Sequence, residues 1–155
     1  MHFVLLTWNP GPRNEHVFTP EEWDAAVVAP NSRGETVEMT WGVGRHVNNI
    51  EPGDTAFMYR QGAWGRGIVA RGTIRTHPWA GPDQRQPGGT RNHVDLEWQE
   101  SVPTDVAMDL GDLEALAPEF GWRQVYASGR QLPAATGAKV SREWEEHVQA
   151  IASRD

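Results

Sequence analysis

The fold is indicated most strongly by residues 2–8, His2-Phe3-Val4-Leu5-Leu6-Thr7-Trp8, and by the residues that follow, Asn9-Pro10-Gly11-Pro12. The first run is apolar and rich in residues that favour β-strands. The second run combines Asn, Pro and Gly, which is typical of a tight turn. The stretch therefore predicts a first strand that ends beside an exposed turn. It has no basic residues before its short apolar run, so it is not typical of a signal peptide.

Further strands and helices are predicted downstream. Thr19 and Glu22 form the sequence pattern of a helix capping box, and we expect this helix to end before Pro30. Residues 36–41, 55–60, 66–74 and 93–98 are alternating or apolar runs that predict strands. The polar stretch 78–92, which contains several Pro and Gly residues, predicts a long loop.

The last third of the chain predicts two helices. One covers residues 109–117, and the other carries an apolar stripe of Val140, Trp144, Val148 and Ile151 at spacings of three and four. The pattern as a whole predicts one α+β domain over residues 1–155. We expect a small mixed β-barrel of about five to six strands flanked by helices.

Tryptophan is unusually abundant, with eight residues in a chain of 155. The apolar faces of predicted elements assign Trp23, Trp98 and Trp144 to packing. Trp8, Trp41 and Trp64 instead fall at strand ends or in a Gly-rich loop, where scaffolds present binding residues. Each of these rings taken alone fits core packing better, but flat rings gathered there can enclose a base that has left its stack.

Charge is distributed unevenly along the chain. The formal net charge is −7, which by itself argues against a nucleic-acid partner. Residues 41–91, however, contain seven Arg against three acidic residues, a net +4, and the remainder carries −11. This clustering predicts one basic face. Thirteen of the fourteen basic residues are Arg, which suits phosphate contacts, although a GC-rich genome would also raise the Arg content.

Motifs for catalysis are missing from the sequence. There is no Cys, which excludes disulfides, zinc ribbons and thiol nucleophiles, and the six His residues lack metal-ligand spacing. A metal-dependent nuclease needs clustered carboxylates, usually with a Lys beside them, and the only Lys is Lys139. No apolar run approaches the roughly 18 to 20 residues of a membrane span. We therefore expect a cytoplasmic, non-catalytic protein without a metal or cofactor.

Several short motifs occur together in a set order. They are residues 5–10, 41–45, 52–54, 59–61, 66–70, 94–98 and 128–129. In order and spacing this set resembles the EVE-type domains of the PUA-like superfamily, especially those at the N-terminus of HNH-containing, modification-dependent (type IV-like) restriction endonucleases. The resemblance covers about residues 2–150 and implies a PUA-like fold. It also implies that a modified base in double-stranded DNA, 5-methylcytosine or 5-hydroxymethylcytosine, is flipped into an aromatic pocket.

Site residues follow from the resemblance and from the residue types. The base-binding pocket would comprise Trp8, Asn9, Trp41, Gly42, Val43, Tyr59, Arg60, Gln61, Trp64, Ser128 and Gly129. The phosphate contacts would be Arg45, Arg66, Arg71 and Arg130. A nuclease module of the HNH type, fused or separate, would be the partner that cleaves the DNA.

Two other functions stay open. Related PUA-like domains, including the YTH group, bind modified RNA, so an RNA-binding module is one alternative. A small hydrolase of modified nucleosides, as among ASCH-type relatives, is the other. The hydrolase would require a Lys and an acid in the pocket, and only Lys139 is present.

Overall fold

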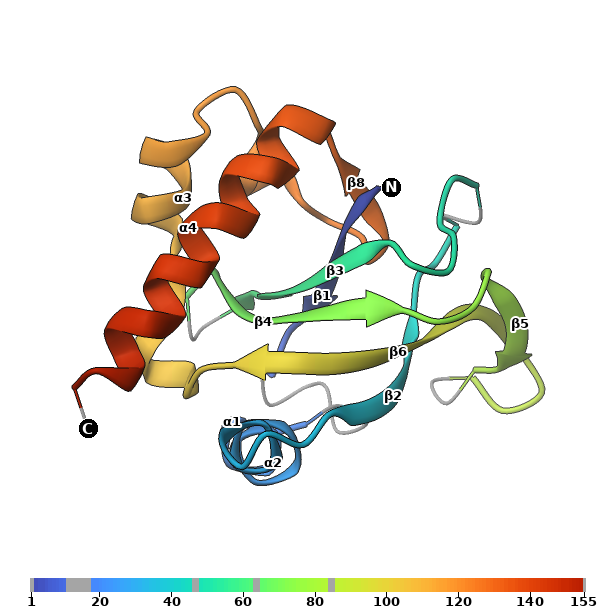
Figure 1. Cartoon of the computed structure of the whole chain (residues 1–155). Helices are drawn as coiled ribbons and strands as arrows, with labels where there is room; N and C mark the ends of the chain where they lie inside the picture. The colour runs from blue at the N-terminus through green and yellow to red at the C-terminus, as the bar shows by residue number, and fades with distance from the viewer. Residues whose placement is uncertain (1, 11–17, 46–47, 63–64, 84–85, 155) are drawn as a thin grey trace.

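The computed structural model describes residues 2–10, 18–45, 48–62, 65–83 and 86–154. Within these residues one curved, eight-stranded sheet runs through the molecule, with helices on both of its faces (Figure 1). The strands are β1 (Phe3–Trp8), β2 (Val37–Gly42), β3 (Thr55–Arg60), β4 (Gly67–Ile74), β5 (Trp79–Pro82), β6 (Thr90–Ser101), β7 (Met108–Asp109) and β8 (Arg130–Leu132).

The strands follow the order β2-β6-β4-β3-β1-β8, while β5 pairs with β6 and β7 pairs with β4. Strands β1 and β3 are parallel, and the other pairs are antiparallel. The sheet curls until β2 approaches β1, where the Trp41 indole nitrogen donates to the carbonyl oxygen of Thr7 at 3.0 Å. This contact joins two strands that lie four places apart in the strand order.

The count of eight strands corrects the expected five to six. Strand β5 lies inside the stretch 78–92 that was expected to be a loop, and β7 and β8 are only two and three residues long. Each of the three is defined by backbone pairing, β5 with the following strand β6, and β7 and β8 with the distant strands β4 and β1. Side-chain alternation over two to four residues is too short to indicate such strands.

A helical segment begins after its N-cap residue, Thr19. It consists of α1 (Pro20–Trp23), a π-helical turn (Asp24–Val28) and α2 (Ala29–Ser32). The predicted capping box is confirmed, since Thr19 Oγ1 accepts from the Glu22 amide at 3.1 Å and Glu22 Oε1 accepts from the Thr19 amide at 3.0 Å. The predicted end before Pro30 is wrong. The π turn, in which the Ala29 amide donates to the Asp24 carbonyl, shifts the hydrogen-bond register and accommodates a proline that has no N–H.

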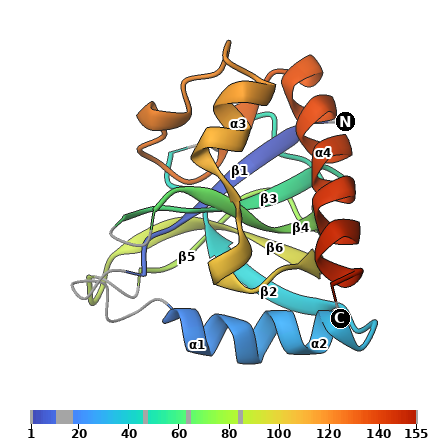
Figure 2. The ribbon, with the colours of Figure 1, turned by 90° about the vertical axis from the view of Figure 1, so that its left-hand side faces the viewer.

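The remaining helices are α3 (Leu110–Leu116) and α4 (Ala134–Ala152), together with 3-10 turns at Thr104–Val106 and Trp122–Gln124. Helices α3 and α4 cover one face of the sheet, and α1 and α2 cover the other (Figures 1 and 2). Both faces are consequently buried. The described residues contain two apolar clusters, one on the α1–α2 face and one on the α3–α4 face.

The alternation of β1 divides its side chains between these clusters. Val4, Leu6 and Trp8 enter the cluster on the α1–α2 face, while Leu5 enters the cluster on the α3–α4 face. The packing roles predicted for Trp23, Trp98 and Trp144 are confirmed, since all three are fully buried. Trp122, which the sequence left unassigned, is also buried.

Helix α4 approaches β1 closely at Gly137. A Cβ atom at this position would overlap the ring of Phe3. We therefore expect Gly137→Ala to lower the free energy of unfolding by about 1–3 kcal/mol, because overpacking outweighs the better helix propensity of Ala. Urea denaturation followed by circular dichroism measures the change. Gly111→Ala in α3 is the matched control: a Cβ there meets only Asp109 Oδ1 at 3.4 Å, so stability should be unchanged or slightly higher. Equal effects of the two substitutions would contradict the close-packing argument.

Candidate functional site

Strands β1 and β3 end side by side, and two distant segments, around Trp41 and Ser128, join them there. Trp8 lies opposite Arg60 in the pairing, and the Gln61 amide donates to the Trp8 carbonyl oxygen at 2.7 Å. The Thr7 amide donates to Ser128 Oγ at 3.1 Å, and the Thr7 carbonyl oxygen accepts from Trp41 Nε1 at 3.0 Å. We call the group Thr7, Asn9, Trp41, Gln61 and Ser128 the β1 rim.

The β1 rim combines one aromatic ring with polar groups. Trp41 and Gln61 are half-buried, Asn9 is exposed, and Ser128 is 7% exposed. The side chain of Asn9 lies over Gly62, whose φ of +86° and missing Cβ leave room for the amide. The rim therefore presents an indole, two carboxamides and a hydroxyl from four separate parts of the chain.

Residues 125–129 form one wall of the β1 rim. The Gln61 Nε2 atom donates to the Val125 carbonyl oxygen at 2.5 Å, and the Gly129 amide donates to the Leu5 carbonyl oxygen at 2.8 Å. Gly129 has φ of +97°, a conformation that favours glycine. These bonds bring the predicted residues Ser128 and Gly129 to the predicted residues at the end of β1.

Gly42 and Val43 lie next to Trp41 but face other surroundings. Val43 is fully buried, and its amide donates to the Asn92 carbonyl oxygen at 2.9 Å. The guanidinium of Arg91 lies over Gly42, where a Cβ would be 2.9 Å from Arg91 Nε. Both residues therefore hold the segment around Trp41 in place, and their predicted contact with a base stays a prediction.

Trp8 and Tyr59 are covered by the protein's own side chains. Trp8 stacks on Trp23 with ring centroids 4.9 Å apart, and its Nε1 atom donates to the Phe18 carbonyl oxygen at 2.9 Å. The Tyr59 hydroxyl donates to the Trp122 carbonyl oxygen at 2.7 Å, and burial raises the pKa of Tyr59. In this conformation the two rings pack in the core, because inward alternation along β1 and β3 places them there. Their assignment to a pocket wall stays a prediction.

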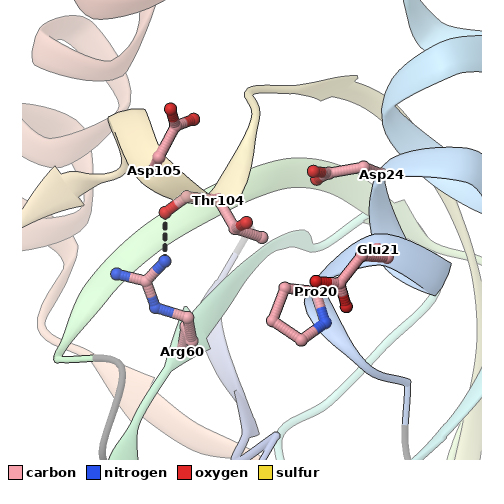
Figure 3. Close-up of a pocket in the computed structure, with 6 residues that line it drawn as sticks. All are labelled: Pro20, Glu21, Asp24, Arg60, Thr104 and Asp105. Carbon is pink, nitrogen blue, oxygen red and sulfur yellow. Dashed lines mark hydrogen bonds between the residues drawn. The ribbon is translucent and has the colours of Figure 1, made fainter.

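Arg60 lies in a different cavity, of about 440 Å³. It is 8% exposed, its Nε atom donates to the Gly65 carbonyl oxygen at 3.3 Å, and its guanidinium also donates to the Thr104 carbonyl oxygen. Burial lowers the pKa of Arg60. The residues lining the cavity are Pro20, Glu21, Asp24, Arg60, Thr104 and Asp105 (Figure 3). With three carboxylates around one guanidinium this cavity does not suit a phosphate, and the predicted contact of Arg60 with a base stays a prediction.

Of the four arginines predicted to bind phosphate, two are held by the protein's own groups and two lie at the surface. Arg66 donates to the Trp122 carbonyl oxygen at 3.0 Å, and Arg71 is held by Glu100 at 2.6 Å and by Glu145 at 3.0 Å. Both therefore stabilise the protein's own structure. Arg45 is exposed, and Arg130 lies over the ring of Phe120 at 4.5 Å with its Nη1 atom 3.2 Å from the Gln124 carbonyl oxygen. Arg45 and Arg130 remain the candidates for phosphate.

The basic face expected from residues 41–91 is only partly formed. Arg75 pairs with Glu97, so Arg71 and Arg75 are neutralised by acidic residues from outside that segment. Arg60 and Arg66 donate to backbone carbonyl groups. Charge counted along the sequence therefore overestimates the charge at this surface. Trp64 and Arg85 lie outside the described residues.

Sequence reasoning missed Thr7, whose backbone connects Trp41 and Ser128, and Tyr126, which is 82% exposed next to Ser128. A signal for Tyr126 was available, because it precedes a Ser-Gly pair in a predicted loop. In the described part of the chain, no group of three or more His, Asp or Glu residues is arranged to hold a metal ion. Nor does that part contain a helix with the length and apolarity needed to cross a bilayer.

Asp24 provides a test of the cavity around Arg60. Burial, followed by repulsion from Asp105 and Glu21, raises the pKa of Asp24, although a hydrogen bond from the Thr104 backbone opposes this. A raised carboxyl pKa means that the folded state binds the proton more tightly than the unfolded chain, so the ionised form lowers stability at neutral pH. We expect Asp24→Asn to raise the free energy of unfolding at pH 7 by less than about 1 kcal/mol, because this half-buried group is partly screened by water.

Urea denaturation at pH 7 and pH 3 tests the expectation, since the gain should shrink as Asp24 becomes protonated in the folded state. Glu143→Gln on the exposed surface of α4, which does not line this cavity, is the control and should leave stability nearly unchanged. A gain that is independent of pH would contradict the assignment.

Comparison with known proteins identifies solved structures of similar fold. No protein-family model and no curated protein sequence matches the chain. A hypothetical protein from Leishmania major matches with a TM-score of 0.64 and 17% identity over 94% of this chain and 96% of that chain. Human THYN1, solved with DNA containing 5-methylcytosine, matches with a TM-score of 0.60 and 14% identity over 90% and 95% of the two chains. The Mmi1 YTH domain, solved with RNA, matches with a TM-score of 0.53 and 10% identity over 99% and 81%. The predicted class, a small mixed α+β domain, is confirmed, and the chain shares its fold with these proteins.

Proposed function

We propose that this chain binds a modified base in nucleic acid after the base has left its stack. The observation that carries the proposal is the β1 rim, where a half-buried Trp41 is fixed by Thr7 next to the amides of Asn9 and Gln61. Stacking of a base on an aromatic side chain contributes about 1–3 kcal/mol. A ring held by its indole nitrogen presents that surface at little entropic cost.

The polar groups of the rim suit a pyrimidine edge. Cytosine offers one amino donor and two acceptors, and a carboxamide supplies both donors and an acceptor. The Asn9 carboxamide and that of Gln61, whose Nε2 atom also donates to the Val125 carbonyl oxygen, would exchange hydrogen bonds with the edge of cytosine when the base binds. Trp41 would provide an apolar neighbour for a 5-methyl or 5-hydroxymethyl group. We propose 5-methylcytosine or 5-hydroxymethylcytosine in double-stranded DNA as the target. The likeness in fold to human THYN1, which was solved with DNA containing 5-methylcytosine, supports this choice.

Titration of fluorescent duplexes tests the proposal. Four matched duplexes carry cytosine, 5-methylcytosine, 5-hydroxymethylcytosine or N6-methyladenine, and binding is measured by anisotropy. We expect a preference of at least about tenfold for one modified cytosine, as one additional stacked and hydrogen-bonded base provides. Trp41→Ala should remove this preference, with Trp41→Phe retaining part of it. Circular dichroism confirms that each variant is folded.

Equal, weak binding to all four duplexes would refute the proposal. Trp8→Ala is a poor probe of the pocket, because truncating this buried ring should cost about 3–5 kcal/mol of stability and would confuse unfolding with loss of binding.

The dependence of binding on salt tests the phosphate contacts. Arg45 and Arg130 are the predicted contacts that the fold leaves at the surface, and each contact contributes about −0.9 to the slope of log K against log salt. Replacing either one by Ala should reduce the slope by about 1 and weaken modified and plain duplexes alike. Arg71→Met is the control. Because Arg71 is paired with Glu100 and Glu145, its replacement should leave the slope unchanged. A change of slope with Arg71→Met alone would contradict this assignment.

We further propose that the chain supplies specificity to a cytoplasmic, modification-dependent restriction system and has no catalytic activity itself. Its partner in cleavage would be an HNH nuclease module, fused or separate. Incubation of the chain with modified plasmid and Mg²⁺ should give no nicking, and the same incubation with the nuclease partner should give cleavage that depends on the modification.

RNA is the second candidate target, and the likeness in fold to the Mmi1 YTH domain, solved with RNA, favours it. Single-stranded RNA with and without N6-methyladenine in the same titration separates the two targets. The position of Lys139 argues against the hydrolase alternative, which needs a Lys in the pocket. Lys139 lies on helix α4 and is not part of the β1 rim, and its Nζ atom donates to Glu119 Oε1 at 3.0 Å. Chromatography of modified nucleosides after incubation tests for turnover.

A further inference from the structure

Tyr126 is an exposed aromatic residue beside the β1 rim. Its side chain is 82% exposed, and the other large hydrophobic residue exposed within the described part of the chain is Trp79, at 39%. Single exposed apolar residues are common on protein surfaces and do not by themselves indicate a binding site. What distinguishes Tyr126 is the way its neighbours in the chain are attached to the rim.

The residues on both sides of the Tyr126–Ala127 pair are buried and hydrogen-bonded to rim segments. Val125 precedes it and accepts from Gln61 Nε2 at 2.5 Å. Ser128 follows two residues later and accepts from the Thr7 amide at 3.1 Å, and the Gly129 amide donates to the Leu5 carbonyl oxygen at 2.8 Å. Tyr126 and Ala127 therefore form a two-residue exposed tip between fixed points.

The exposure of Tyr126 separates its role from that of Trp41. Trp41 is half-buried and held by Thr7, so it suits the inside of a pocket. A ring that is 82% exposed on the adjoining tip has nearly all of its surface available to a partner outside the protein. Ala127, the other residue of the tip, is small, so the apolar surface of the tip comes mainly from the Tyr126 ring.

Charge at the base of the tip favours a nucleic acid. Arg130 lies over the ring of Phe120 at 4.5 Å and donates to the Gln124 carbonyl oxygen, so its guanidinium is fixed beside the segment that carries Tyr126. In a nucleic-acid strand each base is followed by a phosphate. An aromatic ring can stack on the base while a neighbouring guanidinium contacts the phosphate.

We propose that Tyr126 stacks against the duplex at the position that the extruded base has left, while the β1 rim holds the base itself. This inference rests on the proposed function. Removing a base from a duplex exposes the faces of its neighbours and costs a few kcal/mol of stacking. A planar ring that enters the gap restores part of that contact, as apolar side chains do between base steps in bent DNA. The residue would therefore favour the extruded state without touching the modified group.

The test compares a duplex with a free nucleoside. Binding of a duplex containing 5-methylcytosine is measured by anisotropy, and binding of 5-methyl-2′-deoxycytidine by nuclear magnetic resonance titration. Tyr126→Ala should weaken duplex binding about tenfold or more, within the range of one lost stacking contact, and should change nucleoside binding less than twofold. Tyr126→Phe should bind the duplex like the wild type, because the ring and not the hydroxyl is required.

Trp79→Ala is the matched control, since it removes the other exposed aromatic ring, and its duplex affinity should stay within twofold of the wild type. Thermal unfolding verifies that the variants are folded. Duplex affinity that survives in Tyr126→Ala overturns the inference. An equal loss for duplex and nucleoside overturns it too, because Tyr126 would then be part of the pocket. If the wild-type protein binds modified and plain duplexes equally, the proposed function itself is refuted. That result is distinguishable from the two results for Tyr126→Ala.

Discussion

The backbone of Thr7 is the constraint on which the candidate site depends. Its N–H and C=O groups point away from β3, on the edge of β1 where β8 pairs only with Phe3, Val4 and Leu5. Beyond that pairing, the Thr7 groups are satisfied by side chains, with the amide donating to Ser128 and the carbonyl accepting from Trp41. Because buried backbone groups require partners, the end of the short strand β8 creates two anchoring points. The β1 rim is built on these points.

The burial of both faces of the sheet explains most of the tryptophan content. In the described residues, Trp8, Trp23, Trp98, Trp122 and Trp144 are fully buried. Two apolar clusters, one on each face, require more large side chains than a sheet covered on a single face. Trp41 differs from the five because it lies at the edge where the sheet curls onto β1. Its value as a binding residue comes from that position and not from the abundance of Trp.

The electrostatics of the chain favour selectivity over general affinity for nucleic acid. Arg71 and Arg75 are paired with carboxylates, and Arg60 and Arg66 with carbonyl groups, which leaves few cations of the basic segment for phosphate. With a net charge of −7, the non-specific attraction to a polyanion is weak. Under the proposed function, affinity must come mainly from the base in the rim and from contacts at its edge, so plain duplexes should compete poorly.

The sequence by itself determined the class of fold, the first strand and its turn, the capping box at Thr19 and Glu22, and the apolar stripe of α4, because these depend on local periodicity and local hydrogen bonds. It also pointed to Trp41, Asn9 and Gln61 through their positions at or beside strand ends, while Ser128 came from the resemblance to EVE-type domains. Tertiary structure alone decided three matters. Pairing with β6 made a strand of residues 79–82, and ion pairs from distant segments neutralised Arg71 and Arg75. Packing on Trp23 covered Trp8. The ion pairs depend on partners far away in the chain, and the strand pairing and the ring packing depend on how the chain folds back in space. A local sequence pattern does not specify these partners.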